Sequence, residues 1–214
     1  MGRLFGTDGV RGIANRDLNC DLAFKIGAVG AYVLTNEVHS PRILVGMDTR
    51  KSGTMLGSAL SAGICSVGGD VLDVGILPTP AMAYLVRLYE ADAAVMISAS
   101  HNTMEYNGIK WFDKNGFKLQ DEIEDRIESI IQSGEELPRP EGRDVGRVIS
   151  AVRAKKDYCD YLVEQSEYRF EGLRIVLDCA HGASSFIAKE VFERLGAEVI
   201  AKSCAPDGIN INDH

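Results

Sequence analysis

The apolar residues of this 214-residue chain recur at two spacings, and these spacings predict alternating strands and helices. Short runs rich in Val, Ile and Leu predict strands, whereas apolar residues three or four positions apart predict amphipathic helices. The expected strands span residues 42–46, 70–75, 93–97, 173–178 and 197–201. The expected helices span residues 21 to 35–37, 54–67, 81–89, 120–132, 150–166 and 185–195.

A strand followed by a helix and another strand, repeated at this spacing, is typical of stacked βαβ units with a mainly parallel sheet. Two turn signals, the first of them Asn107-Gly108, interrupt this order and predict a β-hairpin from residues 109–112 and 117–119. The hairpin is expected beside the parallel sheet, where it returns Lys110 toward Ser100. The expected fold class is therefore α/β, with a mixed, mainly parallel sheet sandwiched by helices.

Residues 133–146 lose the apolar periodicity and contain two prolines and three glycines, as an exposed connection does. We place a first domain at residues 1–150 and a second α/β domain at residues 151–214. After residue 173 the chain holds two expected strands and one helix, which are too few to bury a sheet well. The second domain is therefore expected to be incomplete, with the chain stopping in mid-domain.

Composition and charge narrow the classes of partner. Acidic residues outnumber basic ones by 31 to 23, and the net charge of −8 disfavours a nucleic acid backbone. No apolar run approaches the roughly 20 residues of a membrane span, and the first residues lack the apolar segment of a secretory signal. The five cysteines are odd in number and lack CxxC spacing, and Cys65 and Cys179 lie in apolar runs, so buried thiols in a reducing compartment are expected. These features predict a soluble cytoplasmic protein.

The run Ile97 to Asn102 carries the main candidate for chemistry. It is the end of an apolar strand that breaks into small polar residues, with the Ser100 hydroxyl at the tip. Open α/β sheets bind ligands outside the carboxyl ends of their strands, where this hydroxyl is expected. Taken alone, a serine in a polar turn is more often a hydrogen-bonding loop residue than a nucleophile.

Two further loops carry charges that have a structural and a functional interpretation. In the glycine-rich run Phe5 to Gly12, Arg11 either pairs with Asp8 or binds an anion. After the strand 42–46, Asp48 and Arg50 either pair across their loop or take part in a site.

Five motifs in order along the chain resemble the α-D-phosphohexomutase family, and within it the bacterial enzymes that act on glucosamine phosphate. The motifs are Phe5 to Gly12, Gly46 to Arg50, Leu77 to Pro80, Ile97 to Asn102 and Asn107 to Lys110. The resemblance continues through residues 178–185 and 206–212. Five ordered motifs are strong evidence, whereas one alone is weak.

The resemblance implies that Ser100 carries a phosphoryl group and exchanges it with a sugar phosphate through a bisphosphate intermediate, on the route to UDP-N-acetylglucosamine and the cell wall. It also implies that the phosphoserine ligates Mg²⁺, that Lys110 is the general base and that Arg11 lies beside the phosphoserine. His101 and Asn102 are expected to organise the loop. A phosphosugar substrate and a homodimer are the implied partners.

The chain departs from the family pattern in two ways. Thr103 stands where the family has a proline, which is expected to loosen the turn without removing a chemical group. Family members also have four domains, whereas the resemblance covers the first and part of the second. The metal-binding loop, the sugar-recognition loop and the C-terminal phosphate clamp are expected to be absent, so the polypeptide alone is expected to have negligible activity and poor Mg²⁺ affinity.

Three other interpretations remain. A serine hydrolase would use Ser100 and His101, but adjacent residues rarely place an imidazole on the hydroxyl, and the GxSxG pattern is absent from the sequence. The second interpretation is a non-catalytic α/β module for binding or dimerisation, and the third is a phosphohexomutase for glucose or mannose. A dinucleotide-binding fold is disfavoured because no GxGxxG follows the first strand.

Overall fold

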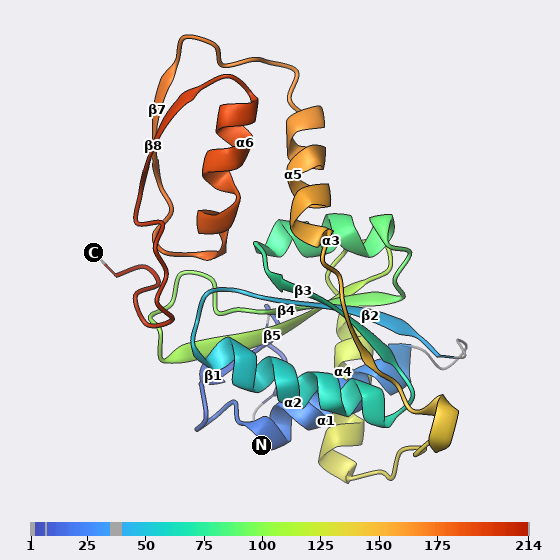
Figure 1. Cartoon of the computed structure of the whole chain (residues 1–214). Coiled ribbons are helices and arrows are strands. Elements are labelled where there is room, and N and C mark those ends of the chain that lie inside the picture. The colour runs from blue at the N-terminus through green and yellow to red at the C-terminus, as the bar shows by residue number, and fades with distance from the viewer. Residues whose placement is uncertain (1–2, 7, 35–39, 214) are drawn as a thin grey trace.

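The computed structural model describes residues 3–6, 8–34 and 40–213, and these residues form one sheet of six strands and another of two (Figure 1). The strands of the large sheet lie in the order β1-β5-β4-β2-β3-β6. They are β1 (Val10–Ile13), β2 (Arg42–Met47), β3 (Asp70–Ile76), β4 (Ala93–Ile97), β5 (Tyr106–Asp113) and β6 (Val148–Ser150). The four neighbouring strands β4, β2, β3 and β6 are parallel to one another. β5 is antiparallel to both of its neighbours, β1 and β4. The predicted mixed, mainly parallel sheet is confirmed.

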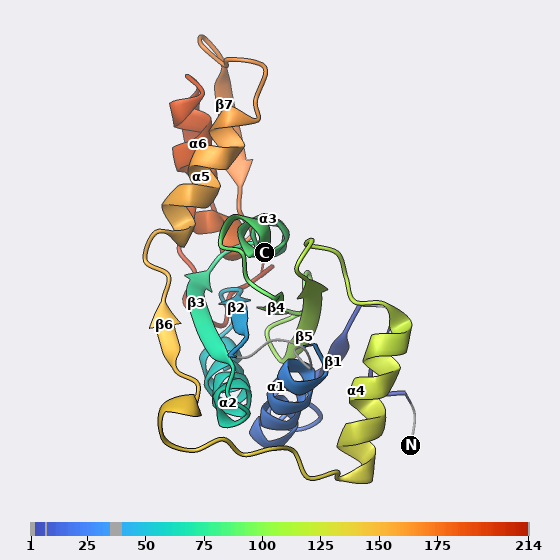
Figure 2. The same cartoon turned by 90° about the vertical axis from the view of Figure 1, so that its right-hand side faces the viewer.

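Helices cover both faces of this sheet (Figure 2). One face carries α1 (Cys20–Leu34), α2 (Ser52–Ser66) and α4 (Asp121–Ser133), and the other carries α3 (Thr79–Leu88). Because successive strand residues point to opposite faces, Ile43 and Val45 join the first core and Leu44 joins the second. The buried strands are apolar on both faces for this reason.

Two glycines bring the backbones of α1 and α2 into direct contact. A Cβ atom on Gly63 would overlap the carbonyl oxygen of Phe24, and one on Gly27 would overlap that of Leu60. The two helices can therefore pack closely only while both positions lack a side chain.

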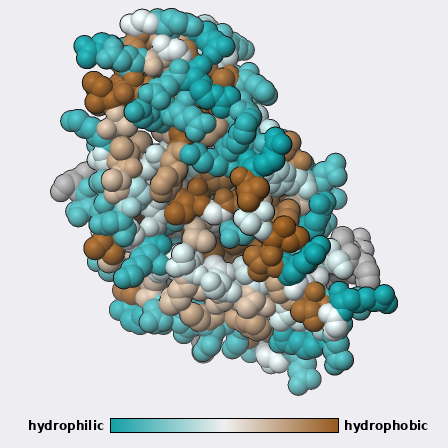
Figure 3. Space-filling view, viewed as in Figure 1, coloured by the Kyte–Doolittle hydropathy of each residue, from teal (hydrophilic) through white to brown (hydrophobic). Residues whose placement is uncertain are grey.

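The second sheet belongs to a smaller unit, formed by α5 (Ala154–Glu164), β7 (Arg174–Asp178), α6 (Ala188–Arg194) and β8 (Glu198–Lys202). β7 and β8 are parallel. Tyr158 and Val191 of this unit share a core with Met82 of α3, and Figure 3 shows apolar residues across the middle of the face at the level of α3. The unit therefore packs on the helix that covers the large sheet. The boundary at residues 150 and 151 falls at the end of β6 and stays a prediction.

The turn predicted at Asn107-Gly108 is wrong, whereas the predicted reversal after residue 112 is present. Asn107 and Gly108 lie inside β5, which is one continuous strand. The chain reverses at residues 113–116, where the Gly116 amide donates to the Asp113 carbonyl, and residues 117–119 return antiparallel to β5 through the bridge between Phe112 and Lys118. Gly108 serves close packing, because a Cβ there would lie 2.6 Å from the Ser98 carbonyl oxygen. Asn107 is fully buried, and its Oδ1 accepts a hydrogen bond from the Gly108 amide. The reversal expected at Asn107-Gly108 comes earlier, between β4 and β5.

Other differences concern short elements and helix ends. The strands β1 and β6 were not predicted. β6 ends at residue 150, where a helix was expected to begin, and α5 begins only at Ala154. The helix expected at 185–195 is divided into a 3-10 turn at Ala183–Phe186 and α6. The expected end of α1 at 35–37 lies outside the described residues. Within the described part of the chain, no helix is long and apolar enough to span a membrane.

The expectation of buried thiols holds for one cysteine. Cys159 is buried, while Cys204 is exposed and the other three are half-buried. Cys204 lies beyond the end of β8, a strand whose residues alternate between exposed and half-buried. The expectation is therefore wrong for Cys204.

We expect Gly63→Ala to lower the free energy of unfolding by about 1–3 kcal/mol, because the new methyl group overlaps backbone atoms of α1. Urea denaturation measures this change. Gly57→Ala is the matched control, since Gly57 lies in the same helix and gains the same helix propensity, and its nearest neighbours are the flexible ends of Ile97 and Met47 at 3.3 and 3.4 Å. Equal stabilities of the two variants would contradict the backbone contact.

Candidate active site

The candidate site lies where the parallel strands β2 and β4 end side by side. Met47 and Ile97, the last residues of the two strands, are partners in the sheet, and the Asp48 amide donates to the Ile97 carbonyl at 3.0 Å. The loop after β2 therefore lies against the turn that carries Ser100. The same edge of an open sheet is where ligands bind.

A buried ion pair joins these two loops. Arg50 Nε lies 2.9 Å from Asp48 Oδ2, and the two side chains are 0% and 5% exposed. The Arg50 amide also donates to Asp48 Oδ1 at 3.0 Å. The sequence left a structural and a functional interpretation of these charges open, and the structure shows the pair. Each charge is compensated, as burial requires.

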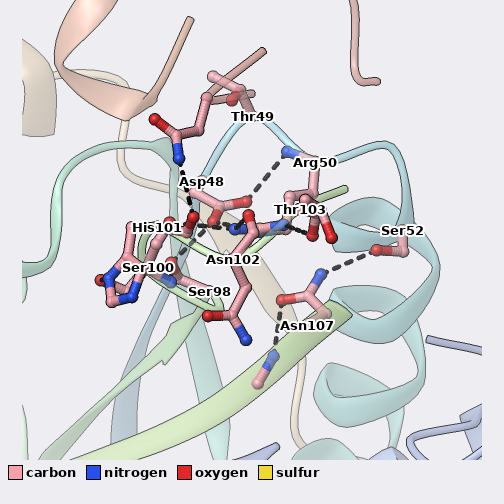
Figure 4. Close-up of polar contacts among 12 residues, drawn as sticks. Asp48, Thr49, Arg50, Ser52, Ser98, Ser100, His101, Asn102, Thr103 and Asn107 are labelled. Atoms are coloured by element: carbon pink, nitrogen blue, oxygen red, sulfur yellow. Dashed lines mark hydrogen bonds and ion pairs between the residues drawn. The ribbon is translucent and has the colours of Figure 1, made fainter. Parts of the chain in front are cut away.

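Arg50 uses the rest of its guanidinium group to hold the backbone of the serine turn (Figure 4). Nη2 donates to the carbonyl oxygens of Ser100 and Asn102 at 3.0 and 2.8 Å, and Nη1 donates to that of Thr103 at 2.5 Å. One rigid side chain thus fixes the directions of three carbonyl groups within residues 100–103. The contact at Thr103 uses a backbone oxygen, which a proline would also provide.

Ser98 completes the connection between Asp48 and the turn. Its hydroxyl donates to Asp48 Oδ2 at 2.7 Å and accepts the Ser100 amide at 3.0 Å. Ser100 has a φ of 57°, in the left-handed region that residues with a side chain rarely adopt. The predicted phosphoryl carrier therefore sits in an unusual backbone conformation held from both sides.

The Ser100 side chain opens onto a cavity of about 350 Å³. Asp48, Ser98 and His101 line it on one side, and residues of the small unit, among them Gly182 and Asn212, line it on the other. Ser100 Oγ lies 3.4 Å from His101 Nδ1, which is too long for a strong hydrogen bond. This geometry disfavours the serine hydrolase interpretation.

Three hydrogen bonds hold residues that follow β7 and β8 against the serine turn and the loop after β2, and no motif in the sequence indicates them. Asn212 Nδ2 donates to the His101 carbonyl at 3.0 Å, and Thr49 Oγ1 donates to the His181 carbonyl at 2.7 Å. The Lys51 amide donates to the Gly208 carbonyl at 2.8 Å. His101 thus contributes its backbone to the interface between the two units.

Arg11 and Lys110 are brought together by Asp8, which forms an ion pair with each of them. Arg11 is on β1 opposite Gly108 of β5, and its Cγ lies 3.1 Å from the position a Gly108 Cβ would take. The same position is 2.6 Å from the Ser98 carbonyl oxygen, so Arg11 packs beside the start of the serine turn. Lys110 lies opposite Met96 of β4. The pairing of Asp8 with Lys110 was missed, because it depends on β5 lying between β1 and β4.

The environment of Asp8 favours its charged form. Partial burial raises the pKa of the carboxyl group, but the hydrogen bond and charge of Lys110, followed by the charge of Arg11, outweigh burial and leave this pKa below its usual value. Asp8 therefore remains an anion at neutral pH and holds two cations next to each other.

The residues that the structure describes do not make up a complete Mg²⁺ site. They contain no group of three or more His, Cys, Asp or Glu side chains that could hold a metal ion. Asp48 is the carboxylate next to Ser100 in the cavity, and its oxygens already accept hydrogen bonds from Arg50 and Ser98. A phosphorylated Ser100 alone could not supply the six ligands that Mg²⁺ prefers.

Comparison with known proteins agrees with this arrangement of motifs. The family model described as phosphoglucomutase/phosphomannomutase, alpha/beta/alpha domain I, matches residues 2–138. The chain belongs to this family. The match includes the serine turn, Asp8, Arg11 and Lys110, so all of these residues come from the part of the chain shared with the family's first domain.

Curated proteins similar to this chain include phosphoglucosamine mutases. The one from Clostridium novyi is 58% identical over 213 residues, which cover 99% of this chain and 47% of the relative. The one from a Thermoanaerobacter species is 57% identical over 212 residues, with the same coverage. The chain thus spans about half the length of the curated relatives it matches.

Solved structures share the fold. A phosphoglucomutase/phosphomannomutase family protein from Burkholderia thailandensis superposes with a TM-score of 0.84 at 24% identity, covering 99% of this chain and 46% of that one. A putative phosphomannomutase from Thermus thermophilus superposes with a TM-score of 0.79 at 24% identity, covering 96% of this chain and 46% of that one. At this identity the likeness shows the fold alone.

We expect Arg50→Ala to lower the free energy of unfolding by about 3–5 kcal/mol, because it leaves the Asp48 charge buried and unpaired. Urea denaturation followed by circular dichroism measures the loss. Arg16→Ala is the control, since Arg16 pairs with Asp17 on the surface and its loss should leave stability close to that of the parent chain. An Arg50 variant as stable as the Arg16 variant would show that the buried pair does not support the fold.

Proposed function

We propose that this chain supplies the phosphoserine-bearing part of a phosphoglucosamine mutase, which interconverts glucosamine 6-phosphate and glucosamine 1-phosphate. The observation that carries the proposal is the exposed Ser100 hydroxyl, held on a braced turn at the cavity between the two units. The preference for glucosamine is supported by the 58% identical relative, whose name states that activity.

In the proposed reaction, Ser100 Oγ forms a bond to phosphorus while the bond between that phosphorus and a sugar oxygen breaks. The seryl proton passes to the departing sugar oxygen. In the reverse direction the phosphoserine gives its phosphoryl group to a sugar hydroxyl, whose proton returns to Ser100. A sugar bisphosphate that turns round between the two transfers converts one monophosphate into the other.

Two cations on β1 and β5, beside the strand β4 that leads to Ser100, suit this chemistry. Phosphoryl transfer depends mainly on positioning and on neutralising the phosphate oxygens. Arg11 and Lys110 are the proposed cations, and Asp8 keeps them together until a phosphate arrives. Lys110 is also the proposed general base, a role in which it must first give up a proton and release Asp8. His101 is the proposed organiser of the turn, through its contact with Asn212.

The wider setting of the proposal follows the family resemblance. A Mg²⁺ ion would accept one ligand from phosphorylated Ser100 and the rest from outside the described residues. The phosphosugar would be the partner, as part of a homodimeric cytoplasmic enzyme on the route to UDP-N-acetylglucosamine and peptidoglycan. Residues 1–150 would be the first domain and residues 151–214 the start of the second. A phosphoglucomutase or phosphomannomutase is the second candidate, favoured by the name of the matching family model.

We expect one phosphoryl group on Ser100 after the chain is incubated with glucose 1,6-bisphosphate and Mg²⁺, because the hydroxyl faces the cavity. Intact-mass measurement and peptide mapping locate the group. Ser100→Ala should abolish the labelling, whereas Ser58→Ala should retain it, since Ser58 is an exposed residue of α2. Phosphoryl groups found on other residues would count against the proposal.

We expect the 214-residue chain alone to convert glucosamine 6-phosphate at a negligible rate, because it spans about half the length of the relatives that carry this activity by name. Phosphorus NMR follows the appearance of glucosamine 1-phosphate. The full-length Clostridium novyi relative, assayed in parallel, is the positive control. Comparable rates for the two proteins would show that the part of the relative that this chain does not span is not required.

A further inference from the structure

The Ser98 hydroxyl occupies a bridging position between a buried anion and the backbone of Ser100. Its proton is directed to Asp48 Oδ2 at 2.7 Å, so its lone pairs are free to accept the Ser100 N–H at 3.0 Å. Asp48 is in turn held by Arg50 through two contacts of 2.9 and 3.0 Å. The Ser98 hydroxyl therefore has a fixed orientation.

The Ser98 hydroxyl holds the backbone of Ser100, which has an unfavourable left-handed conformation. Ser100 has a left-handed backbone, and its N–H and C=O groups set the direction in which Cβ and Oγ leave the turn. Arg50 holds the Ser100 carbonyl and Ser98 holds the amide, and both rest on the same Asp48 carboxylate. Without the Ser98 hydroxyl only one of these two restraints remains.

We propose that Ser98 is a positioning residue for phosphoryl transfer, whose hydroxyl fixes the Ser100 amide and thereby directs Ser100 Oγ into the cavity. This inference rests on the proposed function. The Ser98 hydroxyl lines the same cavity, but it is not the phosphoryl acceptor. To attack phosphorus it would have to release the Ser100 amide and leave a buried carboxylate with one hydrogen bond fewer.

The experiment compares Ser98→Ala with Ser98→Thr, which retains the hydroxyl, and with Ser58→Ala as a control serine on the surface of α2. Three quantities are measured for each variant: the rate of phosphoryl transfer from glucose 1,6-bisphosphate to Ser100, the hydrogen exchange of the Ser100 amide by NMR, and the urea midpoint. The rate is recorded over a range of bisphosphate concentrations, so that the maximal rate and the half-saturating concentration are separated.

We expect Ser98→Ala to lower the maximal transfer rate by about 10- to 100-fold, with little change in the half-saturating concentration, because the reacting oxygen is displaced while the bisphosphate still binds. The Ser100 amide should exchange at least about tenfold faster, because its hydrogen-bond acceptor is gone. Ser98→Thr should restore both values. The urea midpoint shows that each variant is folded under the assay conditions, so a general loss of structure is recognised separately.

The outcomes separate this inference from the proposed function. If the parent chain is labelled on Ser100 and Ser98→Ala matches it in rate and amide exchange, Ser98 has no positioning role and the proposed function stands. If the parent chain is not labelled on Ser100, the proposed function fails, and the amide exchange alone then decides whether Ser98 holds the turn. A phosphoryl group found on Ser98 in place of Ser100 would overturn both.

Discussion

The buried ion pair between Asp48 and Arg50 is the interaction on which the rest of the site depends. Two charges removed from water are tolerated only when each has several partners, and here every partner belongs to the serine turn or to the pair itself. A lysine could neutralise Asp48, but it lacks the planar guanidinium fork through which Arg50 also reaches three carbonyl groups. Because these buried charges require their partners, the pair holds the turn that carries Ser100 in one conformation.

Much of this arrangement could be predicted from the sequence, because it follows from parallel strands. Apolar runs identified β2 and β4, and neighbouring parallel strands end at the same sheet edge, which places Asp48 next to the serine turn. The arrangement of Arg11 and Lys110 could not be predicted in the same way. It depends on β1 and β5, which are antiparallel additions; β1 is only four residues long, and β5 contains a sequence that normally signals a turn.

Asn107-Gly108 shows why local turn chemistry failed here. The pair favours a hairpin turn when the flanking strands pair with each other, but tertiary packing decides otherwise in this chain. Gly108 is needed because Ser98 and Arg11 crowd the space a side chain would take, and Asn107 satisfies backbone and side-chain partners in a fully buried position. A glycine selected for close approach and a glycine selected for a turn look alike in a sequence.

Asp8 pairs with both Arg11 and Lys110, and the charges of the three groups indicate that a phosphate could replace it. Asp8 offers Arg11 and Lys110 one negative charge shared between them, whereas a seryl phosphate carries between one and two at neutral pH with three acceptor oxygens. On the proposed function, a phosphoryl group that came within reach of Arg11 and Lys110 would compete with Asp8 for them. The ion pairs of the unphosphorylated chain then keep the cations in place without fixing them permanently, while the Asp48 and Arg50 pair, which is sealed from water, keeps the turn in one shape throughout.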